Sequence, residues 1–203
     1  GSWQALQAQR LKLMAAYSTV AQIGYLFIFL PLIVALPEGP LKDAAFTALL
    51  LMALTHGFAK SAFFLSAGVI QQYCGHDRIA EPGGTARALP LTIFVIALSG
   101  VALIGLPPSG SFLGKWHLIS SSLHAGQWWW VPVIAAGSIL ATAYVFRILG
   151  YAFAPGEGVG RVLQWGREEI PAFILALMAT LILGFGSAEL WDFVSQNNGF
   201  PGN

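Results

Sequence analysis

Long apolar runs, separated by short polar stretches, account for most of this chain. The runs lie at about residues 13–36, 44–72, 90–105, 112–123, 131–153 and 170–193. A helix needs roughly 20 apolar residues to cross the hydrocarbon core of a bilayer. The pattern therefore predicts an all-α integral membrane fold with about six hydrophobic helical segments, of which 112–123 is short for a span.

Two of these runs carry further expectations about packing. The run at 44–72 is longer than a bilayer requires, so its helix is expected to tilt or to break near Gly57. The first half of the run at 13–36 is rich in small and hydroxyl residues, which favour close approach of helices. That half is expected to face protein, whereas Phe27, Phe29 and Leu30 are expected to face lipid.

The polar stretches divide the chain into five parts. Residues 1–12 are predicted to be the end of a preceding helix or a short interfacial segment. A transmembrane module follows at 13–153, a polar loop at 154–169, a final transmembrane helix at 170–193 and a tail at 194–203.

The module contains one break that a regular helix cannot accommodate. Pro107, Pro108 and Gly110 lie in GLPPSGSFLGKW, between two apolar runs. Proline removes a backbone donor and clashes with the preceding turn of a helix. At membrane depth such a break is tolerated only inside protein or beside a water-filled cavity. Broken helices of this kind form ion sites in transporters.

The basic residues between the runs give little indication of orientation. If each run crosses the membrane once, the four on the first side are Arg10, Lys12, Arg78 and Arg87. The three on the opposite side are Lys42, Arg161 and Arg167. A difference of four to three is weak support for placing the first group in the cytoplasm.

Composition strengthens the membrane assignment and excludes several kinds of function. Of the 203 residues, 56% are hydrophobic and 9% are charged, with a mean hydropathy of +0.69. The net charge of +1 gives no electrostatic basis for binding nucleic acid. The single cysteine, Cys74, rules out an internal disulfide, and we find no metal-ligand spacing, nucleophile elbow or pair of catalytic carboxylates. No cofactor, metal, hydrolytic site or redox site is predicted for this chain.

Lys60 and His56 are the leading candidates for chemistry. They lie four residues apart in THGFAKSAFFLSAG, so on a helix they share one face. A lysine at the centre of a bilayer costs roughly 2.5–3.5 kcal/mol on insertion scales, so retaining one there suggests a proton relay, an ion path or a buried pair. The alternative is a lysine that extends to the interface or pairs with an acid, although the acids lie in loops or near segment ends.

Lys115 is the second candidate, because it follows the break directly. A helix N-terminus disfavours a cation, which makes Lys115 easy to displace toward water or an acid. The alternative is an interfacial lysine beside Trp116. His117 is a possible relay residue on the same segment, and His124 is expected to be interfacial beside three tryptophans.

The positions of Lys12 and Arg147 each allow two interpretations. Lys12 precedes an apolar run, where basic residues commonly act as topology signals. Arg147 lies late in the run at 131–153 and is either an interfacial anchor or a buried partner, hence a possible relay residue.

Four stretches together resemble the proton-conducting antiporter-like family. They are LKLMAAYSTVAQIGY, THGFAKSAFFLSAG, GLPPSGSFLGKWHLI and ATAYVFRIL. The family comprises the large membrane subunits of respiratory complex I, of membrane-bound hydrogenases and of Mrp-type cation/proton antiporters. The resemblance covers about residues 5–153, in the family's order.

The resemblance implies a fold of two inverted five-helix repeats, each with a broken helix, joined by a central line of charged residues and water. By motif, Lys60 would be the central relay lysine with His56 beside it, and Lys115 the terminal lysine on the second broken helix. Lys12 would match the basic residue that opens the preceding helix. Two positions depart from the pattern, because Arg10 replaces the usual acid and Leu13 the usual arginine.

The resemblance also concerns only the second half of the family fold, since family members are usually well over twice this length. We therefore expect the chain to be the C-terminal part of a larger subunit or one piece of a split one. Its expected partners are the N-terminal half of the same subunit, other membrane subunits and the lipid bilayer. Its expected location is a bacterial or archaeal cytoplasmic membrane.

Proton translocation, alone or with cation antiport, is the function that the resemblance implies. The host would be an NADH-quinone oxidoreductase-like complex, a hydrogenase or an Mrp antiporter, and the motifs do not choose among them. A non-pumping structural subunit and a module of an energy-coupled inorganic carbon uptake system are the two alternatives.

Overall fold

The computed structural model describes residues 1–80, 83–156, 169–189 and 192. The described residues form helices joined by short connections. In chain order these are α1 (Ser2–Gln7), α2 (Leu11–Ala35), α3 (Pro40–Cys74), α4 (Thr85–Ala88), α5 (Pro90–Ile104), α6 (Gly110–His124), α7 (Trp130–Phe153), α8 (Glu169–Leu177), the π-helical turn η1 (Met178–Ile182) and α9 (Leu183–Phe185). The prediction of an all-α fold is confirmed.

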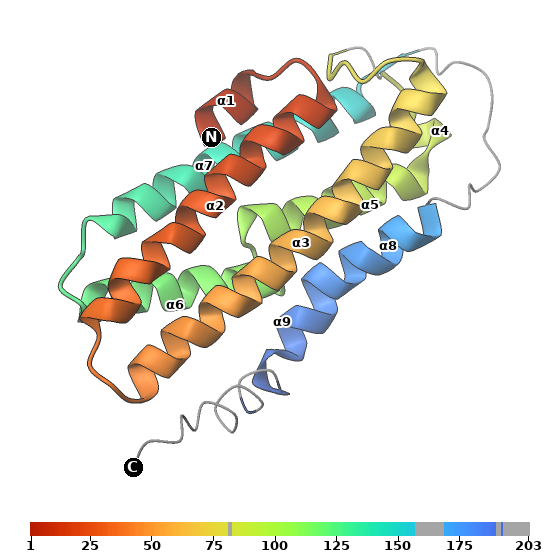
Figure 1. Cartoon of the computed structure of the whole chain (residues 1–203). Helices are drawn as coiled ribbons and strands as arrows, with labels where there is room; N and C mark the ends of the chain where they lie inside the picture. Colours follow the sequence, from red (N-terminus) through yellow and green to blue (C-terminus); the bar gives the residue numbers. More distant parts are fainter. Residues whose placement is uncertain (81–82, 157–168, 190–191, 193–203) are drawn as a thin grey trace.

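Helix α3 is the central element of the bundle. It lies between α2 and α8 in Figure 1 and packs against α2, α5, α6 and α8. Pro40 begins the helix, where its missing amide hydrogen costs nothing, and Gly75 ends it in the left-handed conformation with φ of 77°. No break occurs near Gly57, since α3 is a single helix of 35 residues.

Among the described residues, three helices are long and apolar enough to cross a membrane, namely α2, α3 and α7. The early half of α2 faces protein as expected, since Ala15 and Ser18 are buried, and Phe27 and Leu30 are exposed. The expectation for Phe29 is wrong, because its side chain is fully buried in a cluster with Leu32 and Met52. Phe29 lies one turn from Tyr25 and Leu32 and therefore shares their inward face.

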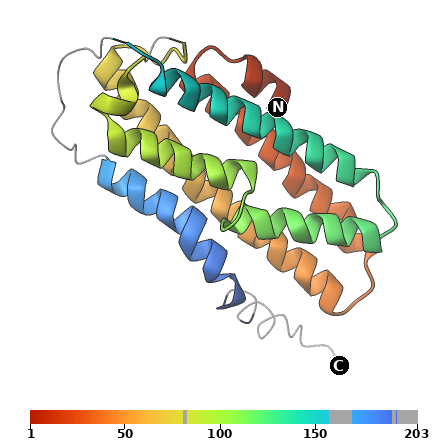
Figure 2. The same cartoon turned by 180° about the vertical axis from the view of Figure 1, so that it is seen from behind.

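Helices α5 and α6 together make one passage through the bundle. Figure 2 shows them end to end, with the break between them in the middle of the molecule. The Gly84 amide, ahead of α5, donates to the Ala154 carbonyl at the end of α7 (2.9 Å). The next helix, α8, begins with Glu169, which accepts a hydrogen bond from Thr92 near the start of α5. These contacts place the start of α5, the end of α7 and the start of α8 together.

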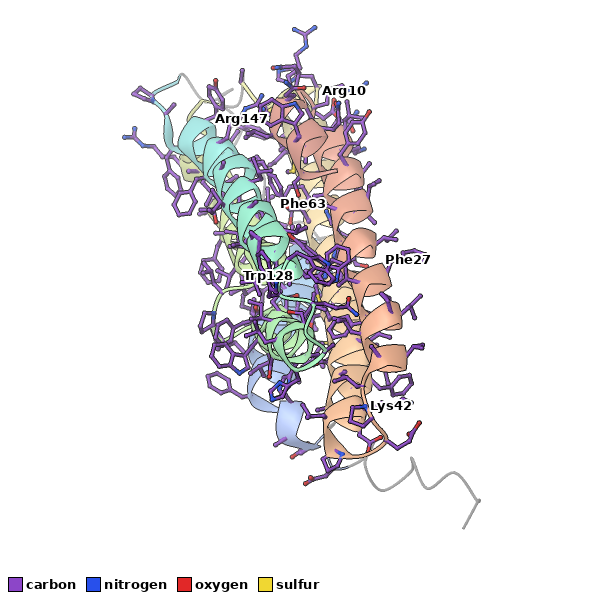
Figure 3. All side chains as sticks on the ribbon, turned by 90° about the vertical axis from the view of Figure 1, so that its left-hand side faces the viewer. Arg10, Phe27, Lys42, Phe63, Trp128 and Arg147 are labelled. Atoms are coloured by element: carbon purple, nitrogen blue, oxygen red, sulfur yellow. The ribbon has the colours of Figure 1, made fainter. Side chains whose placement is uncertain are left out.

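The assumption of one crossing per apolar run, on which the comparison of loop charges depends, does not fit this arrangement. The runs at 90–105 and 112–123 share one crossing, because the chain breaks inside the bundle instead of at its surface. An ion pair between Arg10 and Asp77 (2.7 Å) ties the start of α2 to the loop after α3, and Arg10 lies at the opposite end from Lys42 in Figure 3. Arg161, Arg167 and the predicted tail at 194–203 lie outside the described residues.

Close contact between α5 and α7 depends on Gly100. A side-chain carbon at this position would lie 2.5 Å from the Val145 Cγ1 atom of α7. Gly150, also on α7, has no neighbouring atom within 4 Å of the equivalent position. The two glycines therefore form a matched pair, one at a helix contact and one outside it.

We expect Gly100→Leu to destabilise the bundle by about 1–3 kcal/mol, because the added side chain overpacks the α5–α7 contact. Gly150→Leu should leave stability nearly unchanged. The thermal denaturation midpoint of the purified protein in detergent measures both effects. Equal midpoints for the two variants would contradict the close packing at Gly100.

Candidate functional site

The Lys60 side chain extends from the middle of α3 toward α2 and is 6% exposed. Its Nζ atom donates to the Ala15 carbonyl oxygen (2.7 Å) and to the Ser18 hydroxyl. It also lies 5.9 Å from the centre of the Phe63 ring, at a distance typical of a cation–π contact. All of these partners are electrically neutral, so Lys60 has no acidic partner in the described part of the chain.

His56 lies one turn before Lys60 on α3 and close enough for their charges to interact. Its Nε2 atom is buried and has no hydrogen-bond partner among the described residues. Buried polar nitrogen atoms in proteins are nearly always hydrogen-bonded to protein or to ordered water. This nitrogen therefore marks a position where water or another polar group would be stabilised.

The helix break that the sequence predicts is enclosed by protein. Ser109 is fully buried, and its hydroxyl donates to the Leu106 carbonyl (2.7 Å) while accepting from the Phe112 amide (3.3 Å). Gly110 allows α6 to approach α3, because a side-chain carbon there would overlap the Thr55 hydroxyl. Gly184 approaches the Pro108 carbonyl from the other side. This arrangement satisfies the requirement that irregular backbone at membrane depth be surrounded by protein.

Lys115 lies in the second turn of α6, and its side chain folds back over the break. Its Nζ atom donates to the Ile104 carbonyl at the end of α5 (2.8 Å) and to the Ser138 hydroxyl of α7 (2.9 Å). The same nitrogen lies 5.0 Å from the centre of the Tyr25 ring of α2. Lys115 is 6% exposed, and its partners, like those of Lys60, are neutral.

Both buried lysines therefore contact α2, and Lys115 also contacts Ser138 of α7. Lys60 contacts Ser18 of α2, and Lys115 contacts Tyr25 of the same helix. Seven residues of helix separate these two contacts, which corresponds to about 10 Å along the axis. The structure thus brings Lys60, His56 and Lys115 into one buried polar region.

Lys12 and Arg147 lie outside this region in the described chain. Lys12 is exposed at the start of α2. Arg147 donates to the Leu6 carbonyl and to the Gln9 side-chain oxygen (3.3 Å), so it holds the segment before α2 against α7. The relay roles of both residues stay predictions.

The two histidines of α6 differ in exposure. His117 is half-buried, two residues after Lys115, and its relay role also stays a prediction. His124 is exposed at the end of α6, with its Nδ1 atom 2.8 Å from the Ser120 carbonyl oxygen. In the described residues, no group of three or more His, Cys, Asp or Glu side chains is placed to hold a metal ion.

Five further polar residues line the region between the lysines. None of them is among the candidates predicted from the sequence. They are Ser18, Gln22, Tyr25, Ser138 and Tyr144. The sequence pattern could have indicated three of them. Ser18, Gln22 and Tyr25 are spaced by four and three residues in an otherwise apolar helix, so they form a polar stripe on one face.

Comparison with known proteins finds one matching family and several similar membrane subunits. The family described as "NADH:quinone oxidoreductase/Mrp antiporter, TM" matches residues 1–141. The NADH-quinone oxidoreductase subunit N of Desulforudis audaxviator is 33% identical over 97% of this chain and 39% of its own length. The chain thus spans about two fifths of the length of that curated relative.

Two solved structures show the same fold. The membrane-bound sulfane sulfur reductase, an archaeal respiratory membrane complex, contains a chain that matches 96% of this one with a TM-score of 0.81 and 24% identity, over 38% of its own length. Respiratory complex I from Thermus thermophilus contains a chain that matches 96% with a TM-score of 0.77 and 20% identity, over 41% of its own length.

Gly105 provides a test of how Lys115 is held. Its backbone has φ of +81°, and a side-chain carbon would lie 2.8 Å from the Lys115 Cδ atom. Gly126 has a similar φ of +69° but has no neighbouring atom within 4 Å. The two glycines therefore separate backbone strain from contact with Lys115.

We expect Gly105→Ala to lower the thermal denaturation midpoint of the purified protein more than Gly126→Ala does. Both variants carry the left-handed backbone cost of about 1–2 kcal/mol, and only the first displaces Lys115. In a Lys115→Ala background the extra loss should disappear. Equal losses in the wild-type background would show that Lys115 does not occupy the space above Gly105.

Proposed function

Since this chain belongs to the NADH:quinone oxidoreductase/Mrp antiporter transmembrane family, we propose that it carries protons across an energy-coupling membrane. Lys60, with His56 beside it, and Lys115 would take up and release the protons. The observation that carries the proposal is that both lysines are buried and bonded to neutral oxygen atoms. A lysine in a buried site readily exchanges between its charged and neutral forms, which a proton relay requires.

A structural role alone accounts less well for this arrangement. A buried lysine that only stabilises a fold normally pairs with an acid. Glu169 is a buried acid at the start of α8 and could in principle be such a partner. It accepts a hydrogen bond from Thr92 instead. Neither Lys60 nor Lys115 contacts it in the described structure, which leaves both ammonium groups available for proton exchange.

Lys12 would connect Lys60 to the part of the subunit that precedes this chain. It lies three residues before Ala15, whose carbonyl oxygen accepts the Lys60 hydrogen bond. Its exposed side chain at the start of α2 is available to an adjoining half-subunit. His117 and Arg147 remain candidates for later steps.

The host complex would be a respiratory one with subunits of the N type. The similarity to a subunit N over nearly the whole chain supports this choice of host. Electron transfer in other subunits would supply the energy, and the N-terminal half of the same subunit and neighbouring membrane subunits would be the partners. The chain itself would conduct protons and carry out no redox step.

We expect Lys60→Ala to reduce proton uptake by at least about tenfold, because general acid–base groups contribute effects of that size or more. The measurement uses inverted vesicles that contain the complete complex and are supplied with its electron donor. Lys42→Ala is the matched control, since Lys42 is on the same helix but pairs with exposed Glu38 (2.5 Å) at its end.

Assembly of each variant is checked on a native gel, and electron transfer is measured in the same vesicles. An assembled Lys60→Ala complex that takes up protons at the wild-type rate would refute the relay role and favour a structural one.

A further inference from the structure

The helix formed by α8, η1 and α9 changes its winding in the middle. It is continuous, because Leu177, Ile182 and Leu183 at the junctions all have right-handed helical backbone angles, and Figure 1 shows one ribbon there. A π-helical turn links residues five positions apart instead of four, so η1 accommodates one residue more than an α-helical turn would. The residues after η1 are therefore shifted by one position relative to a regular α-helix.

This shift determines which residue of α9 faces the helix break. Gly184 faces Pro108, because a side-chain carbon at position 184 would overlap the Pro108 carbonyl group. One residue advances a regular helix by about 100° and about 1.5 Å. If the same residues wound as a regular α-helix, Leu183 would take the place opposite Pro108, where there is no room for its side chain. The π turn thus keeps a glycine at a position that excludes a side chain.

Contacts on two sides hold the break between α9 and α3. The η1 turn packs against α3, α5 and α6, and its residues Ala179 and Thr180 are fully buried. A side-chain carbon at Gly110, the first residue of α6, would lie 3.2 Å from the Leu183 Cβ atom. The same carbon would overlap the Thr55 hydroxyl of α3. The break therefore has little space in which to move when α9 changes position.

A hydroxyl group supports the π turn from within the helix. Thr180 donates to the Ala176 carbonyl oxygen (2.7 Å), four residues earlier. Hydroxyl bonds of this kind compete with the backbone hydrogen bonds of a helix and bend it. Removal of the hydroxyl is therefore expected to favour regular winding, which places Leu183 opposite Pro108.

The chain on either side of Pro108 forms a tight turn. The Leu106 carbonyl accepts two hydrogen bonds from Ser109, one from its amide (3.0 Å) and one from its hydroxyl (2.7 Å). Ser109 is fully buried. A displacement of Pro108 is therefore passed to Leu106 instead of being absorbed by a flexible loop.

Lys115 lies over the residues that precede this turn. A side-chain carbon at Gly105 would lie 2.8 Å from the Lys115 Cδ atom. The Ile104 carbonyl, one residue earlier, accepts a hydrogen bond from the Lys115 ammonium (2.8 Å). Gly184 thus contacts one side of the break and Lys115 the other.

We propose that Gly184, placed by the η1 turn, is a positioning residue for Lys115. Because it has no side chain, the break lies where the Ile104 carbonyl meets the Lys115 ammonium. The proposal rests on the proton-carrying function above, and it adds a residue of the α8–α9 helix that acts on Lys115 through the break.

Two pairs of variants test this role without changing either lysine. Gly184→Ala adds one carbon against the Pro108 carbonyl, whereas Gly100→Ala adds one carbon against Val145 at the α5–α7 contact. Thr180→Val removes the hydroxyl and keeps the volume of the side chain. Thr180→Ser is its conservative partner, since it keeps the hydroxyl.

The measurement is proton uptake per electron transferred in vesicles that contain the complete complex, beside the thermal denaturation midpoint of the purified protein in detergent. We expect Gly184→Ala and Thr180→Val to lower uptake at least about tenfold, because a displacement of about 1 Å at a reacting group costs up to about a hundredfold. Thr180→Ser should retain wild-type uptake. Gly100→Ala should lower the midpoint and still retain wild-type uptake.

A purely structural role for Gly184 predicts instead that uptake follows the midpoint in all four variants, and that result would overturn the proposal. If Gly184→Ala does not assemble, the Thr180 pair decides. Uptake lost in the valine variant and retained in the serine variant supports the positioning role, and equal uptake in the two refutes it.

Lys60→Ala, measured beside them, separates this proposal from the proposed function. If Lys60→Ala abolishes uptake while Gly184→Ala and Thr180→Val pump normally, the positioning role is refuted and the relay lysine stands. If Lys60→Ala pumps normally, the proton-carrying function is refuted, and the positioning role with it.

Discussion

A lysine ammonium inside a membrane-spanning bundle must be surrounded by oxygen atoms or aromatic rings, because lipid supplies neither. This constraint explains the arrangement of α2, α3, α6 and α7. Lys60 of α3 requires the Ala15 carbonyl and Ser18 hydroxyl of α2. Lys115 of α6 requires the Ile104 carbonyl, which is available only because α5 ends inside the bundle. The break is therefore a source of hydrogen-bond acceptors as well as an interruption of a helix.

Much of this arrangement could be predicted from the sequence. A single lysine in a long apolar run, as in α3, is so unfavourable in lipid that Lys60 could be expected to lie inside protein. Adjacent prolines followed by glycine cannot continue a helix, so the break before Lys115 was equally clear. The resemblance to antiporter-like subunits, based on four stretches in order, agrees with the family that matches residues 1–141.

Other features depend on contacts that no local pattern reveals. Phe29 points inward because of the orientation of α2 about its own axis relative to α3. Apolar residues lie on both faces of α2, so the sequence pattern does not determine that orientation. The shared crossing of α5 and α6 depends on the depth of the break, which residue spacing does not specify. The Tyr25 hydroxyl of α2 lies against Gly137 of α7, and only the packing of the two helices brings these residues together.

If the buried region between Lys60 and Lys115 is a hydrated polar path, ordered water should lie within it. A cryo-electron microscopy map of the complete complex, at a resolution that shows ordered water, tests it most directly. We expect water within hydrogen-bond distance of the Gln22 amide and of the His56 Nε2 atom, with an unbroken series of polar contacts from Ser18 to Tyr25. Apolar side chains packed against Gln22, with no water between Ser18 and Tyr25, would contradict it.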